Sequence, residues 1–102
     1  MIDKTTALES VLRKLQKIPV GHCIDLRTYK RNRSLLILHV QEGDFIIYED
    51  GYDTITHETK LDSMRKLLKT LFKREFPRSN KIRMYELGQF DETMREREMK
   101  KL

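Results

Sequence analysis

The chain has 102 residues, of which 38% are hydrophobic and 36% charged, and its formal net charge is +5. This length fits one domain with a single modest core, and the periodic spacing of the apolar residues excludes a wholly disordered chain. The only cysteine, Cys23, excludes an internal disulfide and a cysteine-ligated zinc site built within one chain.

The first predicted element is a helix over residues 5–17. Thr6 and Glu9 have the spacing of a capping box, in which a hydroxyl and a carboxylate satisfy each other's backbone N–H groups. Pro19 and Gly21 mark the turn that follows this helix. The apolar residues recur every three or four positions and predict one buried stripe, formed by Leu8, Val11, Leu12 and Leu15.

Four strands are predicted next. Alternating apolar and polar residues or short apolar runs predict these strands, and the centre of the basic stretch RTYKRNR, residues 27–33, predicts a loop between the first two. Asp50-Gly51 is the strongest hairpin signal, because both residues tolerate the positive φ angles of a type I′ turn. The predicted strands cover residues 22–28, 34–40, 45–49 and 52–57.

A second helix and a last strand complete the pattern. We expect the helix to begin at Thr59, with Asp62 as capping partner, and to stop before Pro77. Its lysines fall on a solvent-facing arc, separate from a broad apolar arc. Residues 81–87 alternate again and predict the last strand.

The expected fold class is therefore α+β: a mostly antiparallel sheet of four to five strands with two amphipathic helices on one face, in the order α-β-β-β-β-α-β. Residues 1–88 should form a single compact α+β domain. Residues 89–102 form a charged tail, which we expect to be a frayed helix or disordered because it has no apolar stripe.

Charge is unevenly distributed along the chain. Residues 42–58 hold six acids and no lysine or arginine, whereas residues 59–85 hold nine bases and two acids. Residues 25–33 add four bases and one acid. If the two basic segments share a face and escape the carboxylates between them, they form a positive surface that attracts polyanions.

Nucleic acid is one partner that this pattern favours. Arginine and lysine can contact phosphates, and Tyr29 could stack on a base. The pI of about 9.4 agrees with such a surface, although no recognition motif accompanies it. The candidate nucleic-acid-binding residues are Arg27, Tyr29, Lys30, Arg31, Arg33, Lys73, Arg74, Arg78, Lys81 and Arg83.

The alternative hypothesis is a protein–protein interaction or regulatory module that could self-associate. Tyr48 and Tyr52 lie beside acids in the predicted hairpin FIIYEDGYD, and aromatic residues are enriched at interfaces. The basic stretches also have a purely structural explanation, since helices expose lysine and arginine, and cations protect strand edges from aggregation.

Nothing in the sequence indicates catalysis or a cofactor. It contains no nucleophile elbow, phosphate-binding loop, dinucleotide fingerprint or zinc-protease motif, and its three histidines share no ligand spacing. No apolar run approaches the roughly 20 residues that cross a bilayer, and no signal peptide is visible. We therefore expect a non-enzymatic cytoplasmic binding protein with no metal, no cofactor and no membrane partner.

Overall fold

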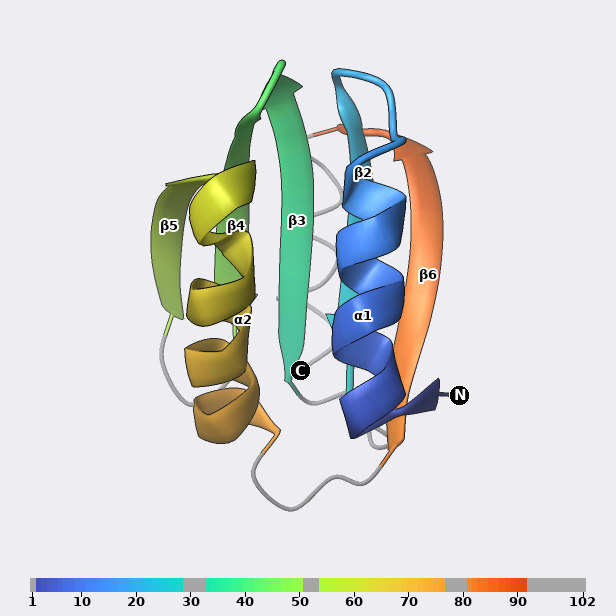
Figure 1. Cartoon of the computed structure of the whole chain (residues 1–102), viewed down its shortest axis with the longest axis vertical. Helices are drawn as coiled ribbons and strands as arrows, with labels where there is room; N and C mark the ends of the chain where they lie inside the picture. Colours follow the sequence, from blue (N-terminus) through green and yellow to red (C-terminus); the bar gives the residue numbers. More distant parts are fainter. Residues whose placement is uncertain (1, 29–32, 51–53, 77–80, 92–102) are drawn as a thin grey trace.

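The computed structural model describes residues 2–28, 33–50, 54–76 and 81–91. Within these ranges the chain forms six strands and two helices (Figure 1). In chain order they are β1 (Ile2–Asp3), α1 (Lys4–Leu15), β2 (His22–Arg27), β3 (Ser34–Gln41), β4 (Asp44–Asp50), β5 (Thr54–Lys60), α2 (Leu61–Glu75) and β6 (Lys81–Gln89).

All the strands join one antiparallel sheet in the order β1-β6-β2-β3-β4-β5. The predicted α+β fold and its order of elements are confirmed. The short strand β1 is the one addition, and its two residues are too few to show any alternation in the sequence. The last predicted strand, β6, lies between β1 and β2, so segments far apart in the chain are neighbours.

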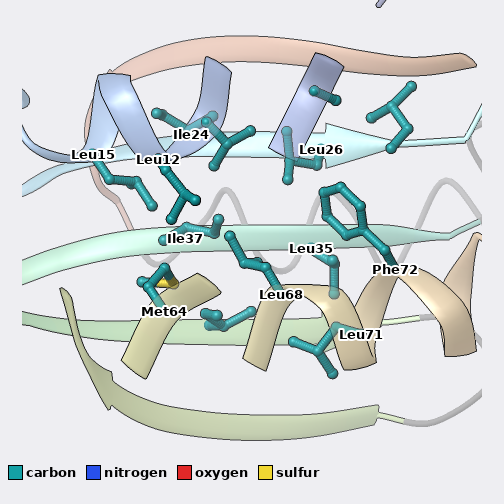
Figure 2. Close-up of a cluster of buried hydrophobic side chains, with 14 of the residues drawn as sticks. Leu12, Leu15, Ile24, Leu26, Leu35, Ile37, Met64, Leu68, Leu71 and Phe72 are labelled. Atoms are coloured by element: carbon teal, nitrogen blue, oxygen red, sulfur yellow. The ribbon is translucent and has the colours of Figure 1, made fainter. Parts of the chain in front are cut away.

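Both helices pack on the same face of the sheet, as predicted (Figure 1). Register brings apolar residues of the central strands to that face, with Ile24 opposite Ile37 and Ile37 opposite Ile47. Figure 2 shows side chains from α1 and α2 meeting those of β2 and β3 in one buried cluster. Burying each such leucine, isoleucine or phenylalanine contributes about 1.5–3 kcal/mol, so this cluster dominates the stability of the fold.

The predicted capping boxes are wrong at both helices. Thr59 lies in β5, opposite Phe45 of β4, and α2 begins only at Leu61 without a side-chain cap. Helix α1 begins at Lys4, directly after β1, so Thr6 lies inside the helix. In both places a paired strand continues up to the residue before the helix, so the strand pairing fixes where the helix begins.

Strand β6 is longer than predicted because it accommodates a bulge. The register with β2 shifts between Cys23 and Ile24, and Gly88 has a φ of +75°, which favours glycine. The backbone N–H of Phe90 then donates to the carbonyl of Gly21 at 2.7 Å. Asp50 is the last residue of β4, whereas Gly51 of the predicted turn and most of the predicted tail, residues 92–102, lie outside the described residues.

Candidate nucleic-acid interface

The two basic segments of the sequence meet at one end of the molecule. Arg27, at the end of β2, is the direct cross-strand neighbour of Arg83 in β6. Arg33 Nη1 donates to the backbone carbonyl of Arg74, in the last turn of α2, at 3.5 Å. The end of β2, the start of β3, the end of α2 and the start of β6 therefore converge, although they are up to 56 positions apart in the chain (Arg27 to Arg83).

Arg27 is buried within this end and paired with an acid. Its Nε donates to Oδ2 of Asp25 at 2.5 Å, and only 1% of Asp25 is exposed. Burial raises the pKa of the Asp25 carboxyl, while the Arg27 guanidinium opposes this rise. Asp25 thus balances the charge of Arg27 inside the fold, and 10% of the Arg27 side chain is exposed. A contact between Arg27 and nucleic acid stays a prediction.

Arg74 is held in the same way by the acidic hairpin. Its Nε donates to Glu49 Oε2 at 2.8 Å and its Nη2 to Oε1 at 2.7 Å, which is a bidentate ion pair. His57 Nε2 lies 2.8 Å from the same Oε1. The side chain of Glu49 is fully buried, so Arg74 balances its charge, while 33% of the Arg74 side chain stays exposed. A contact between Arg74 and nucleic acid stays a prediction.

The remaining candidates divide into three groups. Lys73 and Lys81 are exposed, and Arg33 and Arg83 are half-buried. Tyr29, Lys30, Arg31 and Arg78 lie outside the described residues, so they stay predictions. Of the ten candidate residues, the described ones that are exposed to solvent are therefore Lys73 and Lys81.

The exposed surface of the two helices adds cations that were not among the candidates. Lys66 and Lys69 of α2 are exposed on the same side of the helix as Lys73. Between the helices, Arg65 Nη1 lies 2.7 Å from Glu9 Oε2. The spacing of the lysines along α2 was visible in the sequence, but which helix faces would lie side by side was not.

Tyr48, which the alternative hypothesis places at an interface, contacts another aromatic ring of this chain. It is half-buried and stacks on Phe90, with ring centroids 5.8 Å apart and planes 14° from parallel. This contact lies on the sheet face that the helices leave uncovered. Tyr52 lies outside the described residues.

The other side chains that could react or bind a metal, Cys23 and His39, are packed within the fold. Cys23 is buried, and loss of hydration raises its pKa to about 11, with the charge of Asp25 as a second cause. His39 Nδ1 lies 2.9 Å from the carbonyl of Ile18, and its ring stacks on Phe45. Among the described residues, no three histidine, cysteine, aspartate or glutamate side chains gather in a way that could hold a metal ion.

No helix in the described part of the chain is long and apolar enough to span a membrane. Comparison of the chain with protein-family models, with curated proteins and with solved structures finds no match in any of the three.

Proposed function

We propose that this protein is a small non-enzymatic binding protein that contacts nucleic acid through its basic segments. The observation that supports this function is the meeting of the segments at one end of the molecule, where Arg33 contacts the Arg74 carbonyl and Arg27 lies opposite Arg83. We further propose that it acts in the cytoplasm, where a free cysteine such as Cys23 stays reduced.

The proposed contacts are electrostatic. Exposed lysines bind phosphates as point charges, and each phosphate they neutralise releases a condensed counterion. Lys73 and Lys81 supply this chemistry, together with the predicted contacts Lys30, Arg31 and Arg78. Affinity should consequently fall steeply as salt concentration rises.

The experiment is a fluorescence-anisotropy titration with labelled single-stranded and double-stranded DNA of about 20 nucleotides or base pairs at about 50 mM salt. We expect saturable binding to at least one of the two probes, which weakens more than about tenfold at about 200 mM salt. Absence of binding to both probes at the lower salt concentration would overturn the proposed function.

A matched pair of variants tests the location of the contacts. Lys73→Gln combined with Lys81→Gln removes two exposed charges from the converging end. The control is Lys17→Gln combined with Lys60→Gln, which also removes two exposed charges. Lys17 precedes the start of β2, and Lys60 ends β5, where it pairs with Asp44, so both lie away from the converging end. We expect the first variant to bind DNA about tenfold more weakly and the control to bind like the wild type. Equal effects of the two variants would contradict this location.

The second candidate function is a protein–protein interaction, and the position of β5 favours it. This strand is the last in the sheet on its side, and 39% of its Ile55 is exposed. Such an edge can pair with a strand of a second chain. Light scattering of the purified protein should then give a dimer mass, and Ile55→Lys should reduce it to that of a monomer. A monomer at every concentration would contradict this candidate.

A further inference from the structure

Helix α2 carries three exposed lysines at positions i, i+3 and i+7. At about 1.5 Å per residue they span roughly 10 Å along one side of the helix. We call this row the lysine ridge, and it consists of Lys66, Lys69 and Lys73. The ridge ends at Lys73, next to Arg74, whose carbonyl accepts a hydrogen bond from Arg33. It therefore continues into the end of the molecule where the basic segments meet.

Nearby acids do not neutralise the ridge. No ion pair between described residues includes any of its three lysines. The one carboxylate of α1, that of Glu9, lies 2.7 Å from Arg65 Nη1. The hydrogen bond from Arg65 lowers the pKa of Glu9, and the charges of Arg13 and Lys69 lower it further. Helix α2 also carries Asp62 and Glu75, so α1 and α2 together hold eight bases against three acids, and the excess of charge is positive.

The helix surface lacks the groups that bind single strands. Proteins that hold single-stranded nucleic acid combine cations with exposed aromatic rings, on which the bases stack. The two phenylalanines of α2 and its end, Phe72 and Phe76, are buried in the core. Among the described side chains of α1 and α2, none that is exposed is aromatic. The ridge can bind phosphates but cannot stack on bases.

We propose, building on the nucleic-acid function above, that the lysine ridge binds the phosphate backbone of a nucleic-acid duplex. A duplex presents about one charge per 1.7 Å of its axis in a rigid array, so a straight row of lysines roughly 10 Å long meets several phosphates at once. A flexible single strand gains its affinity by stacking, for which this surface offers no ring. Binding through the ridge is independent of base sequence, because lysines that contact phosphates carry no sequence information.

The test uses a labelled 20-bp DNA duplex and one of its isolated strands at about 50 mM salt. We expect the wild type to bind the duplex at least about threefold more tightly than the strand. Lys66→Gln combined with Lys69→Gln should weaken duplex binding about tenfold and reduce the slope of log affinity against log salt by about 2. Glutamine is a good helix former, so α2 should stay folded, which circular dichroism checks.

The matched control removes the same number of exposed charges elsewhere, with Lys17→Gln combined with Lys60→Gln. Duplex binding by the control should stay within about twofold of the wild type, because its lysines lie outside the ridge. Equal weakening by the two double variants would mean that net charge alone drives binding, and it would overturn the ridge as the site.

The outcomes separate this inference from the proposed function. If DNA binds and Lys81→Gln weakens it while the ridge variant does not, the ridge is excluded and the proposed function stands. Tighter binding to the single strand than to the duplex would likewise exclude the ridge as a duplex site and leave the proposed function standing. If the wild type binds neither probe, the proposed function and this inference are both overturned.

Discussion

Arg74 in the last turn of α2 donates two hydrogen bonds to the carboxylate of Glu49 in β4, at 2.8 and 2.7 Å. Glu49 is fully buried on the helix side of the sheet, with His57 as a further partner. The pair joins the second helix to the acidic hairpin. It also explains why one cation of the basic cluster is structural, while its sequence neighbour Lys73 is exposed.

Glu49→Ala should destabilise the fold by about 3 kcal/mol, because it removes the carboxylate that compensates Arg74. This lies at the lower limit for a broken buried pair, since 33% of the Arg74 side chain is exposed and water can partly solvate it. Urea unfolding followed by circular dichroism measures the change. Glu58→Ala, at an exposed position on β5, is the control and should change stability by less than about 0.5 kcal/mol. Equal effects of the two substitutions would show that the pair contributes nothing.

Leu68→Ala tests the core that positions α2 on the sheet. Leu68 is fully buried among the residues labelled in Figure 2, and truncating such a leucine costs about 2–5 kcal/mol of unfolding free energy. Lys66→Ala, two residues earlier on the exposed side, should change stability by less than about 0.5 kcal/mol. Thermal unfolding compares both with the wild type, and similar melting temperatures for all three proteins would contradict the packing.

Cys23 should react slowly with thiol reagents in the folded protein. The pKa of its thiol is raised to about 11, and the thiolate is the reactive form, so the reactive fraction at pH 8 is about a hundredfold below that of a thiol with a pKa of 9.0. Burial slows access further. Reaction with an aromatic disulfide reagent, followed in buffer and in concentrated urea, measures the ratio. Equal rates in the two conditions would show that Cys23 is not buried and that the pKa of its thiol is not raised.

The pair of Glu9 and Arg65 should be visible in an acid titration. Arg65 lowers the pKa of Glu9, so the pair favours the folded state above the unfolded pKa of glutamate, and this contribution is lost as pH falls through the lower folded pKa. NMR titration of the Glu9 carboxyl should therefore give a value below 4.5, its ordinary value. Arg65→Gln should return it towards 4.5, while Lys17→Gln should leave it unchanged. If the pKa of Glu9 is the same in Arg65→Gln as in the wild type, the contact between the two residues is disproved.

Apolar periodicity was enough to predict the fold class and the placement of both helices on one face. The starts of the helices were not predictable from local signals, because Thr59 pairs with Phe45 and residues 2–3 pair with β6. Those pairings are long-range, and they override the capping signal. The position of β6 beside β2, which brings Arg83 opposite Arg27, likewise depends on contacts that no window of sequence contains.

Part of the site could have been foreseen from strand alternation. Side chains two residues apart in a strand point to the same face, so Glu49 lies on the buried face with Phe45 and Ile47. The sequence therefore indicates a buried carboxylate, which needs a cation to balance its charge. Asp25 and Arg27 are likewise two residues apart and point to the same face. Which cation would meet Glu49 was not predictable, because Arg74 approaches from a separate element. The surface charge therefore follows from tertiary contacts and not from a count of basic residues.

The central claim is that the cations left exposed by these ion pairs bind the phosphates of nucleic acid. Its most direct measurement is the affinity of the whole chain for a labelled 20-bp DNA duplex between about 50 and 200 mM salt. The account predicts saturable binding at the lower concentration and a loss of more than about tenfold at the higher one. An unchanged anisotropy signal at about 50 mM salt, with protein shown to be folded, would contradict it.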